Sequence, residues 1–283
     1  MTDASFTDAR THARTDARTI DKAVILAAGL GNRISSVSHD TPKPLLPLDG
    51  KQGGATFLDW HLMALSKIGC REIYIVGNKK TFGTKLAAME HVNAKWILNP
   101  MEDLSASGSG HSTWFAWNST HAILDGKSRV ALMDADIVYD AALLGDLAQA
   151  GGDASKTLVC AAYRHTHEEV LVFAERAAPA VPRFHGKGLL DTKLVSDATC
   201  LGEATGILLW EPNDHELVRE ATEWTIRYST AKARSEHEDI TQRMMALGRM
   251  TAVTFGSERT FMEVDTPDEY RACVEQVYPR LLA

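Results

Sequence analysis

Residues 23–33, with the sequence AVILAAGLGNR, decide the fold because they lead from an apolar run into a glycine turn. The run from Ala23 to Ala28 contains no polar residue and predicts a buried strand. Gly29 and Gly31 then favour a turn whose backbone N–H groups can approach phosphate oxygens, because neither residue carries a Cβ. A purely structural turn needs the same residues, so this segment alone leaves both interpretations open.

Predicted strands and helices alternate after this turn. Apolar residues recur with a helical period from Phe57 to Ile68, which indicates a helix. We further expect strands at 72–76, 95–98 and 130–133, and helices at 84–89 and 114–124. This alternation predicts an α/β fold: a Rossmann-like, mostly parallel sheet with helices on both faces and ligands at the carboxyl ends of the strands.

The second half of the chain has a different pattern. We expect strands at 158–163, 170–173 and 206–210, and helices at 215–228, 239–247 and 268–281. We therefore predict one domain over residues 22–283, in which 22–157 form the main part and 158–283 form a smaller lobe with a closing helix. Residues 1–21 are an imperfect TDAR repeat with almost no apolar content, which is typical of a disordered tail or of a partner-binding arm.

The composition disfavours several classes of protein. The 283 residues are 45% hydrophobic and 24% charged, as in ordinary soluble domains. The formal net charge of −7 argues against nucleic acid or an anionic membrane as a partner. Four widely spaced cysteines fit neither a zinc site nor a disulfide framework, and no stretch suits a membrane span or a secretory signal. We expect a cytoplasmic protein with small-molecule partners, and we allow for a homodimer.

Two basic residues follow the glycine turn. Arg33 ends the turn itself, and Lys43 stands between two prolines in the segment TPKP, residues 41–44. A guanidinium and an ammonium beside such a turn suit a triphosphate. The segment is not a Walker motif, and Ile34 stands where a dinucleotide fingerprint needs its last glycine. An NAD-linked enzyme is therefore disfavoured.

These residues resemble the signature of a known family. Residues 26–33 with Pro42-Lys43-Pro44 look like the motif of the nucleotidyltransferases, which include the sugar-phosphate nucleotidyltransferases and CTP:phosphocholine cytidylyltransferase. The closer resemblance is to the small cytidylyltransferases acting on phosphocholine and on phosphonates. It rests further on MDAD at 133–136, GILLW at 206–210 and MEVDTPDEY at 262–270, and it covers the chain from about residue 22 to the end. It implies a GT-A-like nucleotidyltransferase fold, in which 22–157 bind the nucleotide and 158–283 bind the acceptor.

Two pairs of carboxylates stand at expected element ends. Asp134 and Asp136 close a predicted strand, and the single residue between them places both side chains on one side of an extended chain, which suits a hard cation. Glu263 and Asp265 form a second pair just before a predicted helix start at Thr266. Aspartates that cap a strand end or a helix entrance would explain both pairs without a metal. The resemblance implies that Asp136 and Asp265 hold one Mg²⁺.

The nucleotide is expected around the end of the first strand. Arg33 and Lys43 are the predicted catalytic cations, because an acceptor oxygen that is already anionic needs positioning and charge neutralisation more than a strong base. The segment SASGSGHS, residues 105–112, either contacts the base or is a flexible loop before a helix. CTP is implied by the resemblance alone. The predicted nucleotide-binding residues are Leu26, Ala27, Ala28, Gly29, Gly31, Arg33, Lys43, Ser107, Gly108 and Asp134.

The acceptor could be recognised by aromatic or by acidic side chains. A phosphocholine site needs an aromatic cage, for which Trp210, Trp224 and Tyr228 are available, although such aromatics also serve as core. Where the phosphocholine enzymes carry a tryptophan, this chain has Glu168-Glu169, and a carboxylate there suits a primary ammonium.

We predict three acceptor-binding residues: Glu169, Glu203 and Trp210. Four basic residues are either ligands of the acceptor phosphate or solvated surface charges: Arg183, Lys187, Lys193 and Arg227.

The sequence thus predicts a Mg²⁺-dependent nucleotidyltransferase that transfers CMP from CTP to a small phosphonate or phosphorylated amino alcohol and releases pyrophosphate. A sugar-1-phosphate nucleotidyltransferase with another triphosphate would share every motif except the lobe. A regulatory nucleotide-binding protein is the third interpretation, but it would not need Arg33, Lys43, Asp136 and Asp265 together.

Overall fold

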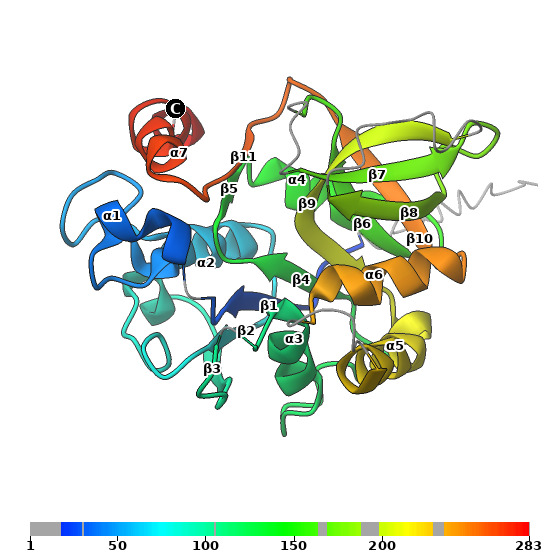
Figure 1. Cartoon of the computed structure of the whole chain (residues 1–283), viewed down its shortest axis with the longest axis horizontal. Coiled ribbons are helices and arrows are strands. Elements are labelled where there is room, and N and C mark those ends of the chain that lie inside the picture. The colour runs from blue at the N-terminus through cyan, green and yellow to red at the C-terminus, as the bar shows by residue number, and fades with distance from the viewer. Residues whose placement is uncertain are drawn as a thin grey trace, which may run out of the picture.

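The computed structural model describes residues 18–29, 31–104, 106–163, 169–187, 198–228 and 235–282. Most of the predicted tail lies outside these residues. The main sheet has the strand order β10-β6-β9-β4-β1-β2-β3, and β7 and β8 continue it from β9 (Figure 1). Its strands are β1 Lys22–Ala27, β2 Glu72–Gly77, β3 Ala94–Leu98, β4 Val130–Asp134, β6 Ser155–Cys160, β7 Val170–Glu175, β8 Pro182–Lys187, β9 Ala198–Trp210 and β10 Met250–Phe255. A small second sheet pairs β5 (Ile137–Tyr139) with β11 (Phe261–Glu263).

The direction of the strands divides the main sheet into two parts. β1 runs parallel to β2 and β4, and β2 runs parallel to β3. β9 lies antiparallel to both β4 and β6, and it also pairs with the antiparallel hairpin of β7 and β8. The predicted α/β fold is confirmed, and β9 is the element that joins the parallel part to the smaller lobe.

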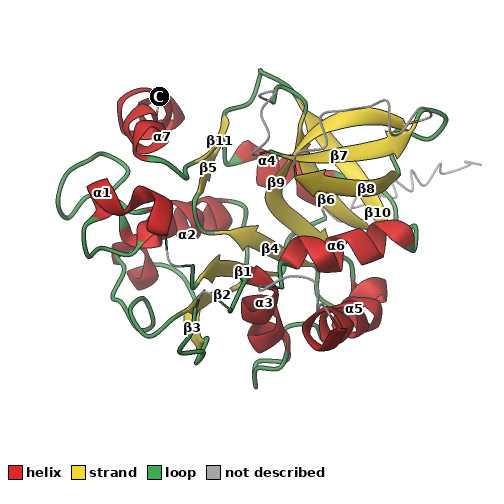
Figure 2. Cartoon of the chain, viewed as in Figure 1, coloured by secondary structure: helices red, strands yellow, loops and turns green. Residues whose placement is uncertain are grey.

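Helices cover both faces of the sheet, as Figure 2 shows. Alternate residues of β1 point to opposite faces: Ala23 and Ile25 belong to one apolar cluster, and Val24 and Leu26 belong to the other. The first cluster contains side chains of α2 (Phe57–Lys67) and α4 (Ala142–Gln149), and the second contains side chains of α3 (Ser109–Trp117), α5 (His215–Tyr228) and α6 (His237–Ala246). The remaining α-helices are α1 Ser35–Ser38, α7 Pro267–Ala272 and α8 Tyr278–Leu282. The apolar run of β1 is therefore buried on both sides.

Two predicted helices differ from the structure. Residues 87–90 form only a 3-10 turn, where a helix over 84–89 was predicted. The helix predicted over 114–124 is α3, which already begins at Ser109. The reason lies far away in the sequence, because Glu236 Oε2 accepts hydrogen bonds from the backbone N–H of Ser109 at 2.9 Å and from its hydroxyl at 2.8 Å. This carboxylate satisfies a free N–H at the start of the helix.

Within the described ranges, no helix combines the length and the apolar character needed to cross a membrane.

Candidate active site

A hollow of about 470 Å³ opens at the carboxyl ends of β1 and β4. It lies where the antiparallel β9 adjoins the parallel strands, a position at which open α/β sheets bind ligands. Predicted nucleotide-binding residues supply much of its wall: Leu26, Ala28, Gly29, Arg33, Ser107, Gly108 and Asp134. A second hollow of about 270 Å³ adjoins it and is lined by Gly31, Arg33 and Lys43, among others. Ala27 differs, since its side chain is fully buried in the core.

The glycine turn brings Lys43 close to β1. Gly31 has φ of 62°, a conformation that side chains other than glycine rarely adopt. A Cβ at Gly31 would also lie 2.9 Å from the Cβ of Lys43. On the other side of the strand end, the Asn78 amide donates to the carbonyl oxygen of Ala28 at 2.9 Å. The turn is therefore held in a shape that only glycine permits.

Three carboxylates gather beside this turn. One oxygen of each of Asp136, Glu263 and Asp265 lies within 4.8 Å of the others. Asp136 follows β4, Glu263 ends β11, and Asp265 comes two residues later, so the small β5–β11 sheet brings them together. Oxygen ligands at such separations suit Mg²⁺, which prefers carboxylates and keeps several waters. The donor set therefore fits a divalent cation, and the structure adds Glu263 to the two ligands that were predicted.

Both predicted catalytic cations contact this carboxylate group. Lys43 Nζ lies 2.7 Å from an oxygen of Asp136 and 2.7 Å from an oxygen of Asp265, and Arg33 donates to Asp265 at 2.5 Å. Burial alone would lower the pKa of Lys43, but the two aspartates outweigh it and raise that pKa. Burial would likewise raise the pKa of Asp265, yet Lys43 and Arg33 lower it. Lys43 and Asp265 therefore each favour the ionised state of the other.

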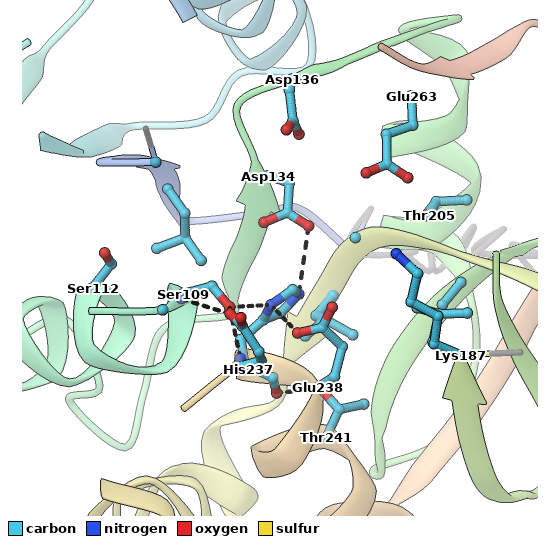
Figure 3. A pocket seen from close by; sticks show the side chains of 18 of the residues that line it. Ser109, Ser112, Asp134, Asp136, Lys187, Thr205, His237, Glu238, Thr241 and Glu263 are labelled. Atoms are coloured by element: carbon cyan, nitrogen blue, oxygen red, sulfur yellow. Dashed lines mark hydrogen bonds and ion pairs between the residues drawn. The ribbon is translucent and has the colours of Figure 1, made fainter. Parts of the chain in front are cut away.

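A charged cluster that sequence analysis missed lines the other side of Asp134 (Figure 3). His237 Nε2 lies 3.6 Å from Asp134 Oδ2, and His237 Nδ1 lies 2.8 Å from Glu238 Oε2. Burial would lower the pKa of His237, but Glu238 and Asp134 raise it to about 10. Burial raises the pKa of Asp134 to about 7, against the effect of His237. His237 is thus a fixed cation between carboxylates.

No sequence signal pointed to this cluster. His237 and Glu238 begin α6, and their local pattern is only that of a helix start. Their role as pocket residues depends on the packing of α6 against β8 and α3, which local spacing does not encode.

The predicted acceptor residues separate into two groups. Glu169 and Glu203 line a smaller hollow of about 150 Å³ that also includes Glu263 and Asp265. Trp210 does not contribute: its side chain is fully buried in the core, and its backbone pairs with Val130 at the end of β4 opposite to Asp134. The prediction of Trp210 as an acceptor ligand therefore disagrees with the structure.

Of the other basic and aromatic residues that were considered for acceptor binding, only some lie at a hollow. Lys187 lines the large hollow. Arg183 pairs with Glu175 and Arg227 pairs with Glu223 at the protein surface. Trp224 and Tyr228 are exposed on α5, and Arg243 stacks 3.1 Å above the Trp224 ring. Lys193 lies outside the described residues.

Comparisons with known proteins show the family of the chain and its fold. The model of the MobA-like NTP transferase domain family matches residues 23–198. A CMP-5'-(3-aminopropyl)phosphonate synthase of Streptomyces rubellomurinus is 34% identical over 144 residues, 50% of this chain and 21% of the relative. An N-acetylmuramate alpha-1-phosphate uridylyltransferase of Neisseria meningitidis is 33% identical over 97 residues, 34% of this chain and 33% of the relative. The aligned segments therefore span at most about a third of these relatives.

Solved structures share the fold. The inositol-1-phosphate CTP transferase of T. maritima superposes with a TM-score of 0.66 at 16% identity and covers 92% of this chain and 98% of its own. A UDP-glucose pyrophosphorylase bound to UDP-glucose gives a TM-score of 0.68 at 14% identity, with 93% and 100% covered. At these identities the likeness concerns the fold alone.

Proposed function

The chain belongs to the MobA-like NTP transferase family, and from this premise we propose that it transfers CMP from CTP to a small phosphonate or phosphorylated amino alcohol, with Mg²⁺, and releases pyrophosphate. The observation that carries the proposal is the convergence of Asp136, Glu263 and Asp265 with Lys43 and Arg33 beside the glycine turn.

Asp136 and Asp265, joined by Glu263, would hold the metal. A divalent cation there supplies positive charge against the phosphates at the point where the chain's own carboxylates gather. The fit rests on oxygen ligands from three side chains within 4.8 Å of one another.

The reaction forms a bond between an acceptor oxygen and the α-phosphorus and breaks the bond from that phosphorus to the bridging oxygen, so that pyrophosphate leaves. The attacking oxygen is anionic near neutral pH, so no proton has to be removed. Arg33 and Lys43 lie where they can neutralise the phosphates, and the backbone of the glycine turn offers N–H donors. Orientation of two anions against their repulsion is the main task of this site.

The acidic character of the pocket supports an acceptor that carries an ammonium group. The large hollow contains Glu236 and Glu238, the smaller one contains Glu169 and Glu203, and both hollows include Glu263 and Asp265. An ammonium group would find carboxylate partners here that a purely anionic acceptor cannot use. The aminopropylphosphonate relative supports the same class of acceptor.

Lys187 is suited to the other end of such an acceptor. It projects into the large hollow from β8, on the side of Asp134 that is opposite to Ser112 in Figure 3. Its positive charge acts on Asp265, which belongs to the carboxylate group. We place the phosphonate or phosphate of the acceptor between Lys187 and that group.

The test is pyrophosphate release by the full chain with Mg²⁺ and each of CTP, UTP, GTP and ATP. The acceptor panel holds 2-aminoethylphosphonate, phosphocholine, a sugar 1-phosphate and a phosphorylated cyclitol. Release that requires metal, CTP and an ammonium-bearing acceptor is expected. Release only with a sugar 1-phosphate and another triphosphate would instead favour a sugar-1-phosphate nucleotidyltransferase. The uridylyltransferase relative supports that alternative.

Two variants check that release comes from this site. Asp136→Asn and Asp265→Asn should each abolish turnover, because each removes a charge from the metal group. Asp146→Asn is the matched control, since Asp146 is half exposed and pairs with Arg259 at the surface. Triphosphate binding without release from any pair would favour a regulatory nucleotide-binding protein instead.

A further inference from the structure

A buried asparagine stands behind the wall of the large hollow. Asn99 directly follows β3, and it is fully buried. Its backbone N–H donates to Gly77 at 2.8 Å, which fixes the position of its main chain. Its side-chain Oδ1 accepts a hydrogen bond from the backbone N–H of Met101 at 3.1 Å. Because a backbone N–H can only donate, the amide atom that faces Met101 must be the oxygen, so the orientation of this amide is determined.

The amide nitrogen of Asn99 therefore faces two serine hydroxyls. Nδ2 donates to Ser107 Oγ at 2.7 Å and to Ser112 Oγ at 3.2 Å. An amide nitrogen carries two N–H donors and accepts no hydrogen bond, so both serine oxygens act as acceptors here. The two hydroxyl protons must consequently point away from Asn99.

The hollow is the direction left for these protons. Ser107 and Ser112 are 5% and 4% exposed, and both line the hollow together with Leu26 and Ala28. Among the residues that the structure describes, neither hydroxyl donates a hydrogen bond to a protein acceptor. A buried donor without an acceptor is costly, so a ligand in this part of the hollow gains by presenting acceptors to it.

The pyrimidine bases differ in the hydrogen-bond acceptors that they offer to such donors. Cytosine has two neighbouring acceptors, O2 and N3, whereas uracil and thymine carry a proton on N3. A serine that faced N3–H could accept it with its second lone pair, but its own buried proton would then have no partner. We propose that Asn99, by orienting the hydroxyls of Ser107 and Ser112 as donors toward the base, makes the protein select cytosine over uracil. This inference rests on the proposed nucleotidyltransferase function.

Asn99→Asp reverses the polarity of this arrangement while keeping the shape of the side chain. A carboxylate can still accept from Met101, but it also accepts from both serines, so their protons turn toward residue 99 and their lone pairs face the base. The wild-type protein should show a kcat/KM for CTP about tenfold or more above that for UTP, the size of effect that one unsatisfied buried donor produces. In Asn99→Asp this CTP:UTP ratio should fall by about tenfold or more.

The measurement pairs turnover with binding. Calorimetric titration with CTP and with UTP in the presence of Mg²⁺ gives the ratio of the two dissociation constants without an acceptor. Thermal unfolding reports whether the variant is folded. Asn118→Asp is the matched control, because Asn118 is an exposed asparagine that follows α3 and whose side-chain amide donates to the Trp114 carbonyl. Its CTP:UTP ratio should equal that of the wild type.

A second variant covers the case in which Asn99→Asp does not fold. Ser112→Ala removes one of the two donors and should weaken the binding of CTP while leaving the binding of UTP nearly unchanged. The inference is wrong if the wild-type protein uses or binds UTP as well as CTP, or if folded Asn99→Asp or Ser112→Ala keeps the wild-type ratio. Pyrophosphate release that is equally efficient with CTP and with UTP would overturn only this inference. Absence of release with every triphosphate would overturn the proposed function.

Discussion

The ammonium nitrogen of Lys43 lies 2.7 Å from Oδ2 of Asp136. It lies equally close to Oδ1 of Asp265, so it stands between two carboxylates that would also hold a metal ion. An ammonium and a divalent cation cannot share these oxygens at contact distance, because their positive charges repel. A metal ion held by these oxygens would therefore compete with the Lys43 ammonium, and under the proposed function the phosphates of the triphosphate would be the new partner of Lys43.

This geometry predicts that Lys43 weakens metal binding in the absence of nucleotide. Lys43→Met should bind Mn²⁺ at least about tenfold more tightly than the wild type, because no ammonium competes for the carboxylate oxygens. The same variant should lose turnover, because the triphosphate loses a counter-charge. Paramagnetic resonance of free and bound Mn²⁺ measures the affinity directly. Lys79→Met is the control, since Lys79 pairs with Glu102 at the exposed surface. Unchanged or weaker Mn²⁺ binding by Lys43→Met would refute the competition.

Gly206 should be intolerant of even one added methyl group. Its φ is 72°, and a Cβ there would lie 2.3 Å from Oδ2 of Asp134. We expect Gly206→Ala to lower the free energy of unfolding by about 1–2 kcal/mol through backbone strain and to reduce kcat/KM by more than about tenfold, because the Asp134 carboxylate must move away from His237.

Gly248→Ala separates these two effects. Gly248 has a similar φ of 67°, but a Cβ there would approach no atom closer than 4.0 Å. This control should lose comparable stability in urea unfolding and keep its activity. Equal activity losses in the two variants would show that displacement of Asp134 is not the cause.

The carboxylates around the two hollows should decide which acceptor is used. Glu169→Gln and Glu238→Gln should each raise KM for 2-aminoethylphosphonate by about tenfold, because each removes a charged partner of an ammonium. KM for ethylphosphonate, which has no ammonium, should change little. Steady-state kinetics at saturating CTP compares the two acceptors, with Glu175→Gln as a surface control, since Glu175 pairs with Arg183. Parallel changes for both acceptors would argue against ammonium recognition.

Much of the wall around the glycine turn was predictable because its residues are contiguous. Gly29, Gly31 and Arg33 follow one strand directly, and a strand end in a parallel sheet has a known relation to its ligand. The α/β class was predictable as well, because each strand and helix shows its apolar pattern within a short segment. Lys43 was predicted from its place between two prolines shortly after the glycine turn, and the family resemblance then supported joining the two segments.

The residues predicted to bind the acceptor, and the His237 cluster, were harder to predict because their positions depend on register and on long-range packing. Trp210 stands only four residues from Gly206, yet β9 carries it to the far end of β4, where it pairs with Val130. His237 and Glu238 reach the hollow only because α6 packs across β8. Neither relation leaves a periodic trace in the sequence.

We expect the buried side chain of His61 to make the folded protein less stable in mild acid. This side chain extends from α2 and is fully buried, and Nδ1 contacts the Tyr139 hydroxyl at 3.2 Å. Burial lowers its pKa from 6.5 to about 4, against a small opposing effect of Asp136. Between these two values the unfolded chain binds a proton that the folded protein does not, so stability falls as the pH falls from about 6.5 toward 4.

The expected size of this effect follows from the difference in pKa. Between pH 7 and pH 5, the wild-type protein should lose about 2 kcal/mol more of its free energy of unfolding than His61→Leu, which has no proton to bind. Urea unfolding at both pH values gives the comparison, and His91→Leu serves as control, because His91 is exposed. The subtraction removes the other histidines and the carboxylates, which titrate alike in both proteins. If wild type and His61→Leu lost equal stability, His61 would have to be protonated already in the folded state, and the buried imidazole would then need a counter-charge that its contacts with Tyr139 do not supply.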